Sequence, residues 1–145
     1  MIDYDKYRQM LLAITPKYTG KVFPVNGCPI ELIGNDIQKH IQGCDSILIS
    51  AATLGEEFDR LLRQIQVTDM AGAVILDMLA GEYIEDFCNE RDKGIRFSPG
   101  YGDFPLSTNR DIVKILDTQK RIGLCVTDEF ILTPQKSITG ITGIT

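Results

Sequence analysis

The segment that most restricts the fold runs from Met70 to Cys88, where the pattern is helical and apolar nearly all round as far as Leu79. Thr68 or Asp69 can cap its first turn, because either side chain can accept a hydrogen bond from a free backbone N–H. A helix without a polar face is typical of a protein interior. We therefore expect a central helix that is buried over its first half and reaches water over its acidic second half.

The apolar run Ser46–Ala52 is bounded by turn residues on both sides and predicts a strand buried on both faces. Periodicity predicts helices over 4–14, 36–41, 58–65 and 108–122, and strands over 21–25, 30–33, 130–132 and 137–145. These elements alternate without a regular repeat, and no G-x-G-x-x-G follows a strand. The prediction is an α+β fold with a mixed or antiparallel twisted sheet and helices packed on it.

Length and composition fit one soluble domain that spans residues 1–145. Hydrophobic residues make up 43% of the chain and charged residues 24%, as in ordinary globular proteins. A net charge of −5 gives the protein little attraction for a phosphate backbone, so we expect no nucleic-acid partner. No apolar stretch is long enough to span a bilayer, so we expect no membrane partner either.

The polar N-terminus does not resemble a secretory signal, and we therefore expect a cytoplasmic protein. That compartment keeps thiols reduced, so the four scattered cysteines are expected to be free. They form no C-x-x-C pair, and no zinc motif, nucleophile–base pair or phosphate-binding loop is present. We predict neither a metal site nor a catalytic residue.

The stretch from Gly94 to Ser107 carries three glycines and two prolines and has no period, which predicts a long loop. Pro99 fixes its own backbone, and Gly100 permits a close approach. Such a loop can present backbone groups to a polar ligand, with Arg96 as a cation and Tyr101 as a flat wall. The alternative is a structural turn whose aromatic side chains fill the core.

The loop sequence Gly94–Tyr101 resembles the G-I-R-x-x-P-G-Y sequence of the activation (reactivation) domain of vitamin B12-dependent methionine synthase. The similarity extends in order over residues 77–140. Its other parts are Asp77–Ala80, Pro105, Ile122–Gly123, Leu124–Asp128, Pro134 and Ser137–Gly140. The chain is similar to a small free-standing relative of that domain.

The resemblance implies a module that binds S-adenosylmethionine and docks on a cobalamin-carrying partner. In that family, one-electron reduction and methylation restore methylcobalamin, and the chemistry belongs to the cofactor. The implied partner is a B12-dependent methionine synthase or a related corrinoid methyltransferase, with flavodoxin or ferredoxin as electron donor. The chain would then be a component of a methyltransferase system rather than a complete enzyme, with S-adenosylmethionine as its own ligand and cobalamin held by the partner.

The resemblance also implies the residues of the ligand site. Arg96 would bind the methionine carboxylate by charge-assisted hydrogen bonds, and Tyr101 would line the adenosyl or sulfonium side. The backbone from Phe97 through Ser98 and Pro99 to Gly100 would hold the rest. Glu82, on the preceding helix, is the candidate acid for the cationic groups of the ligand, although an ungapped alignment places the family's glutamate at Gly81.

Two other classes of function stay open. In the first, the fold serves as a protein-interaction module that docks on a corrinoid protein without binding S-adenosylmethionine. In the second, the chain is an enzyme that acts alone through its thiols.

Overall fold

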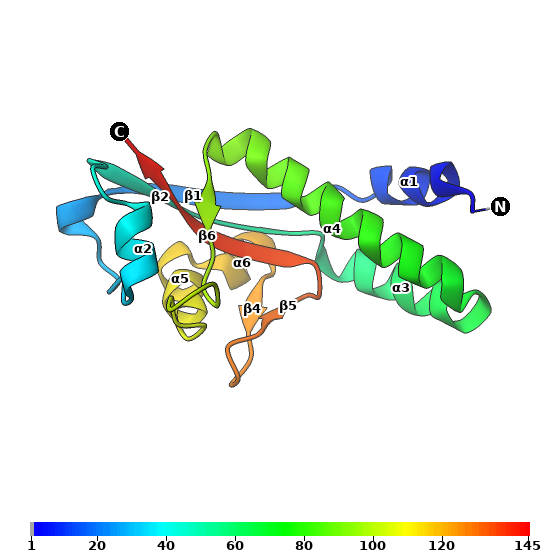
Figure 1. Ribbon diagram of the computed structural model, residues 1–145. Helices are drawn as coiled ribbons and strands as arrows, with labels where there is room; N and C mark the ends of the chain where they lie inside the picture. Colours follow the sequence, from blue (N-terminus) through cyan, green and yellow to red (C-terminus); the bar gives the residue numbers. More distant parts are fainter. Residues whose placement is uncertain (1) are drawn as a thin grey trace.

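The structure, a computed structural model, describes residues 2–145. Its centre is a four-stranded sheet with the order β1-β2-β6-β3, in which all neighbours run antiparallel (Figure 1). These strands are β1 (Lys17–Pro24), β2 (Ser46–Thr53), β6 (Ser137–Ile144) and β3 (Arg96–Phe97). A separate hairpin pairs β4 (Cys125–Val126) with β5 (Leu132–Thr133). The predicted α+β class and antiparallel sheet are confirmed.

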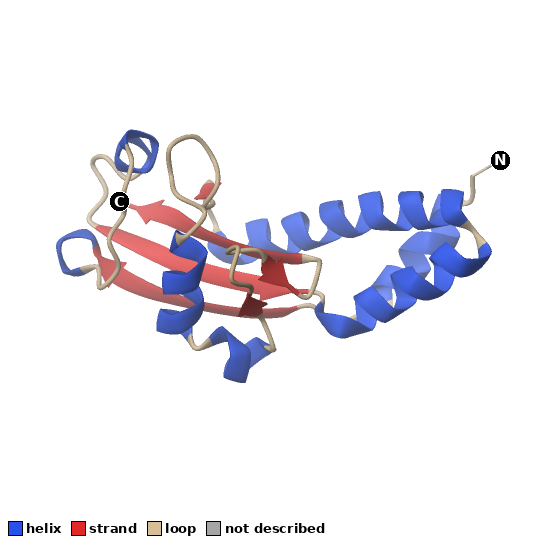
Figure 2. Cartoon of the chain, turned by 90° about the horizontal axis from the view of Figure 1, so that it is seen from below, coloured by secondary structure: helices blue, strands red, loops and turns tan. Residues whose placement is uncertain are grey.

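The helices form two groups. Helices α2 (Asn35–His40), α5 (Thr108–Leu116) and α6 (Thr118–Ile122) cover one face of the sheet. Helices α1 (Tyr4–Leu12), α3 (Gly55–Thr68) and α4 (Met70–Asp92) pack together. They form an arm that extends past the end of the sheet, as Figure 2 shows. The C-terminal half of α4 returns over the other face of the sheet (Figure 1). In the part of the chain that the structure describes, no helix meets the length and hydropathy that crossing a membrane requires.

Strand β2 connects the two hydrophobic clusters, because successive side chains of a strand point to opposite faces of the sheet. Ile47, Ile49 and Ala51 belong to the cluster beneath α2, α5 and α6. Ala52 belongs to the cluster among α1, α3 and α4. The predicted strand is confirmed, and every residue from Ile49 to its end is buried.

Helix α4 differs from the expected helix, because its first half is not buried on all sides. Leu76 is fully buried, whereas Val74 is 63% exposed and Met78 is 47% exposed. Helices α1 and α3 cover one face of α4 only, so apolar side chains on the remaining face stay exposed. The predicted cap at Asp69 is confirmed: its carboxylate accepts a hydrogen bond from the N–H of Gly72 at 2.9 Å.

Two further sequence predictions need correction. Residues 30–33 form no strand, and Ile30 and Leu32 instead pack as an irregular segment on the cluster beneath α5. The predicted helix over 108–122 is divided into α5 and α6 at Asp117, whose φ of 52° lies in the left-handed region. The predicted end of this helical stretch is confirmed, since Gly123 has a φ of 71° and follows Ile122 directly.

The start of α2 is capped by a residue that is distant in the sequence. The carboxylate of Asp103 accepts hydrogen bonds from the backbone N–H groups of Asn35, at 2.7 Å, and Asp36, at 2.9 Å. The Asp36 carboxylate accepts in return from the Asp103 N–H at 3.1 Å. A Cβ at Gly102 would lie 1.9 Å from Asp36 Oδ2, so this close approach requires glycine. The cap fixes the loop of residues 98–106 against α2.

Replacing Asp103 with alanine is expected to lower the melting temperature at pH 7. The backbone N–H groups of Asp36 and Asn35 hold the pKa of Asp103 below its usual value. A carboxylate with a lowered pKa in the folded state stabilises that state above the unfolded pKa of about 3.9, and this contribution is lost as the pH falls toward the folded pKa. Thermal melts of both proteins between pH 7 and pH 3 should therefore converge at the acidic end. A constant gap across this range would contradict the assignment.

Candidate functional site

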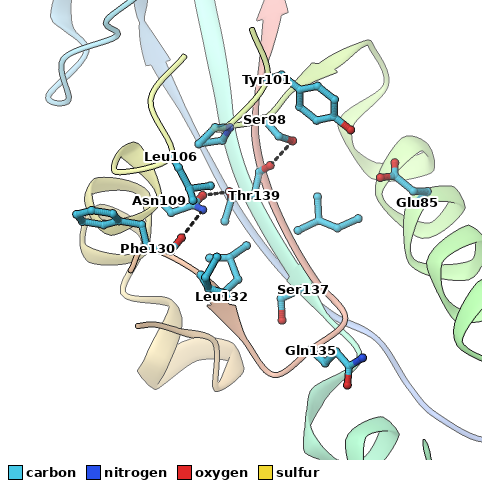
Figure 3. Close-up of a pocket in the computed structure, with 13 residues that line it drawn as sticks. Glu85, Ser98, Tyr101, Leu106, Asn109, Phe130, Leu132, Gln135, Ser137 and Thr139 are labelled. Carbon is cyan, nitrogen blue, oxygen red and sulfur yellow. Dashed lines mark hydrogen bonds between the residues drawn. The ribbon is translucent and has the colours of Figure 1, made fainter. Parts of the chain in front are cut away.

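A pocket of about 330 Å³ lies where the loop of residues 98–106 meets β6, the start of α5 and the β4–β5 hairpin (Figure 3). This volume falls within the range of small-molecule sites. Among its described lining residues Glu85 is the only charged one, and it faces the pocket from α4. The lining residues are Glu85, Ser98, Pro99, Tyr101, Leu106, Asn109, Phe130, Ile131, Leu132, Gln135, Ser137, Ile138 and Thr139.

The loop is held in a defined shape by its own hydrogen bonds and by β6. The Ser98 hydroxyl donates to the carbonyl oxygen of Thr139 at 2.6 Å. The N–H of Gly100 donates to the carbonyl oxygen of Phe104 at 2.8 Å, so this N–H is already occupied within the loop. Tyr101 is 66% exposed, and it lines the pocket.

The alternative role for the loop, a turn whose aromatic side chains fill the core, holds for part of it. Phe104 is buried, and the ring of Phe97 packs on it with a centroid distance of 5.9 Å. Phe97 also lies against His40, at a centroid distance of 5.3 Å. Pro99 is buried and also lines the pocket. The stretch from Gly94 to Ser107 therefore contributes to the core through Phe97 and Phe104, and to the pocket through Ser98, Pro99, Tyr101 and Leu106.

Asn109 connects three of the elements around the pocket. Its side-chain amide donates to the carbonyl oxygen of Phe130 at 3.0 Å, which ties α5 to the β4–β5 hairpin. The Thr139 hydroxyl donates to the side-chain oxygen of Asn109 at 2.6 Å, which ties α5 to β6 (Figure 3). Both Asn109 and Thr139 are buried. A buried network whose members are all satisfied gives the pocket wall a fixed geometry.

Arg96 does not line this pocket, although it lies beside it. Its guanidinium Nη1 donates to Asp92 at 2.7 Å, and Nη2 pairs with Glu85. The Arg96 side chain is 6% exposed, that of Asp92 is 0% exposed, and that of Glu85 is 55% exposed. Asp92 also accepts a hydrogen bond from the Tyr18 hydroxyl at 2.7 Å. Arg96 is thus held between a buried and a half-exposed carboxylate.

Burial and nearby charges shift the pKa values of Arg96 and of two side chains close to it, Cys88 and Tyr18. Burial tends to lower the pKa of the Arg96 guanidinium, but the hydrogen bond to Asp92 and nearby negative charge raise it overall. Burial raises the pKa of the Cys88 thiol to about 12. Burial, followed by the hydrogen bond to Asp92, also raises the pKa of Tyr18. A thiol with so high a pKa is a poor nucleophile, which argues against an enzyme that acts through Cys88.

The structure separates Glu82 from the other predicted site residues. Glu82 lines a different pocket, between α4 and α1, together with Arg8 and Tyr83. The acid that reaches the loop is Glu85, one turn further along α4. Asp77, also on α4, pairs with Lys136 at 3.1 Å. In residues 2–145, no group of three or more His, Cys, Asp or Glu side chains is arranged to hold a metal ion.

The family profile of the vitamin B12-dependent methionine synthase activation domain matches residues 51–144, which is more than half of the chain. The chain belongs to this family. The match confirms the resemblance seen over residues 77–140 and extends it upstream through α3 to residue 51, near the end of β2. A comparison with curated protein sequences gives no match.

The activation-domain fold is also found by structural comparison. A crystal structure of the MetH reactivation domain bound to AdoHcy (S-adenosylhomocysteine) aligns with a TM-score of 0.72 at 18% sequence identity. The alignment covers 97% of this chain and 63% of that one, so this chain spans less than two thirds of the length of that domain.

Two of the segments that carry the resemblance to the activation-domain family meet at the pocket. Ser98, Pro99 and Tyr101 come from the loop, and Ser137 and Thr139 come from β6. The sequence indicated the loop as part of the site, but it did not indicate most of the other residues that line the pocket. The residues it missed are Glu85, Leu106, Asn109, Phe130, Ile131, Leu132, Gln135, Ser137, Ile138 and Thr139. The available signal was the matched segment Ser137–Gly140, because the hairpin residues that line the pocket, Phe130, Ile131 and Leu132, lie outside the matched segments.

Proposed function

We propose that this chain binds S-adenosylmethionine in the pocket between the 98–106 loop and the β4–β5 hairpin. In this role it supports reductive remethylation of cobalamin held by a partner, either a B12-dependent methionine synthase or a related corrinoid methyltransferase. The observation that carries the proposal is that the loop and Ser137–Thr139, two separate segments of the family match, line one pocket. The AdoHcy-bound MetH domain, which shares this fold, adds support.

The residues around the pocket fit such a ligand. Tyr101 supplies an aromatic face for an adenine ring, and Ser137 and Gln135 supply polar groups at the opposite side. Bound S-adenosylmethionine would supply the methyl group, while the chain orients it and shields it from water. Arg96 is the proposed anchor for the carboxylate of the methionine moiety. All of these contacts come from this chain, so ligand binding can be measured without a partner.

Calorimetric titration of the purified chain with S-adenosylmethionine tests the ligand assignment. Heat that saturates below high micromolar ligand is the expected result. Absence of any heat at that concentration would refute binding.

Arg96→Lys is expected to weaken S-adenosylmethionine binding roughly tenfold. Lysine keeps the positive charge but loses the planar fork that can hold Asp92 and a carboxylate together. Isothermal calorimetry measures the change, and circular dichroism verifies the fold. Arg91→Lys is the matched control, because Arg91 is exposed on α4 and does not line the pocket. Equal affinities for the two variants would exclude Arg96 as the anchor.

The protein-interaction module is the second candidate function. It is favoured by the fact that both ends of the Arg96 guanidinium are already paired within the chain. A pull-down of a corrinoid protein in buffer free of S-adenosylmethionine separates the two functions. Capture of equal amounts with and without ligand, together with a silent titration, would favour this second function.

A further inference from the structure

The two carboxylates that hold Arg96 differ in their environment. Asp92 is completely buried, accepts from Arg96 Nη1 at 2.7 Å and also accepts from the Tyr18 hydroxyl. Glu85 pairs with Nη2, yet its side chain is 55% exposed. Removing a buried partner leaves an uncompensated charge, whereas a half-exposed pair contributes little. Asp92 is therefore the permanent partner of Arg96, and Glu85 is the exchangeable one.

Arg96 itself has little freedom to move. It pairs with Thr142 in the short ladder between β3 and β6. The stem of its side chain crosses Gly140, where a Cβ would lie only 2.1 Å from Arg96 Cγ. The buried hydrogen bond to Asp92 fixes one end of the guanidinium. Glu85, in contrast, extends from a solvent-exposed position on α4 and can swing away without disturbing the core.

Glu85 also separates Arg96 from the pocket. Glu85 lines the pocket and contacts Arg96 Nη2, whereas Arg96 itself is not a lining residue. A ligand carboxylate that is to bind this end of the guanidinium has to take the position of the Glu85 carboxylate. Both groups are planar anions that match the guanidinium in the same way.

We propose that Glu85 is an internal competitor that occupies the carboxylate subsite of Arg96 until the carboxylate of an amino-acid ligand displaces it. This inference rests on the proposed function, because it takes the ligand to be an adenosyl compound with an α-amino-acid end. On this proposal, Glu85 lowers the affinity only for ligands that carry a carboxylate, because these have to displace it from Arg96. Ligands without a carboxylate bind without displacing Glu85.

The test compares two ligands on three proteins by isothermal calorimetry. The ligands are S-adenosylmethionine and 5′-methylthioadenosine, which keeps the nucleoside and the sulfur but has no amino-acid end. The proteins are the unchanged chain, Glu85→Ala and Glu90→Ala. The last is a matched control, because it removes the same charge from the same helix, but Glu90 is 81% exposed and does not line the pocket. Circular dichroism verifies that each variant is folded.

In Glu85→Ala, S-adenosylmethionine is expected to bind roughly two- to fivefold more tightly, the size expected for loss of a half-exposed ion pair. The affinity for 5′-methylthioadenosine should not change, and Glu90→Ala should match the unchanged chain with both ligands. This pattern also distinguishes displacement from a simple widening of the pocket, which would alter the affinity for both ligands.

Other outcomes overturn the inference. Weaker S-adenosylmethionine binding in Glu85→Ala would show that Glu85 attracts the cationic groups of the ligand instead of competing with its carboxylate. Unchanged binding, or an equal gain for both ligands, would also reject displacement. In these cases the proposed function stands, because the unchanged chain still binds. If neither the unchanged chain nor Glu85→Ala binds S-adenosylmethionine, the proposed function fails, and this inference fails with it.

Discussion

Replacing Asp92 with alanine is expected to lower the free energy of unfolding by about 3–5 kcal/mol. The Asp92 side chain is 0% exposed and is the only buried carboxylate that contacts Arg96 in the described structure. Without it, the guanidinium keeps its charge in a largely buried position, with Glu85 as its remaining partner. The Tyr18 hydroxyl loses its acceptor as well. Urea denaturation followed by circular dichroism measures the loss.

Two companion variants make this measurement specific to the buried pair. Asp92→Asn retains an oxygen that can accept one of the two hydrogen bonds, so its loss of stability should be intermediate. Glu90→Ala removes an acid from the same turn of α4, but the side chain of Glu90 is 81% exposed, and its effect should be near zero. A loss below about 1 kcal/mol for Asp92→Ala would show that water reaches Arg96 and that the pair is not effectively buried.

Leu76→Ala is expected to lower the free energy of unfolding by about 2–5 kcal/mol. Leu76 is fully buried among α1, α3 and α4, so the substitution removes apolar contacts and leaves a cavity. Val74→Ala, two residues away on the same helix, should change the stability by less than about 0.5 kcal/mol. Val74 is 63% exposed and loses little contact.

This pair of variants tests which face of α4 is directed inward. Thermal or urea unfolding of both variants is sufficient, since each substitution keeps good helix-forming character. Similar losses for the two variants would mean that another surface covers Val74 in solution. A small loss for Leu76→Ala would mean that the arm of α1, α3 and α4 is packed less tightly than the structure shows.

The candidate site was only partly predictable, because its residues come from distant parts of the chain. The loop from Arg96 to Tyr101 was recognisable, since proline, glycine and the family motif lie next to one another. The place of Glu85 at the pocket was not predictable. Glu82 and Glu85 are both exposed acids on one helix, and only the direction in which α4 crosses the sheet places Glu85 at the loop.

The sequence by itself determined the features that depend on neighbouring residues. These are the buried strand β2, the Asp69 cap of α4, the end of α6 at Gly123 and the motif-bearing loop. Each arises from periodicity, capping or turn chemistry within a few positions. The tertiary structure alone decided that α4 keeps an exposed apolar face and that Asp103 caps α2.

The role of Arg96 shows the same division. Its motif marked it as a ligand contact, but its position between Asp92 and Glu85 follows from the return of α4 over the sheet. Burial of a charged side chain is stable only where the fold brings a partner of opposite charge to it. Asp92 lies only four residues before Arg96, but α4 ends between them, at Lys93 with a φ of 54°, and β3 then brings Arg96 back against both Asp92 and Glu85.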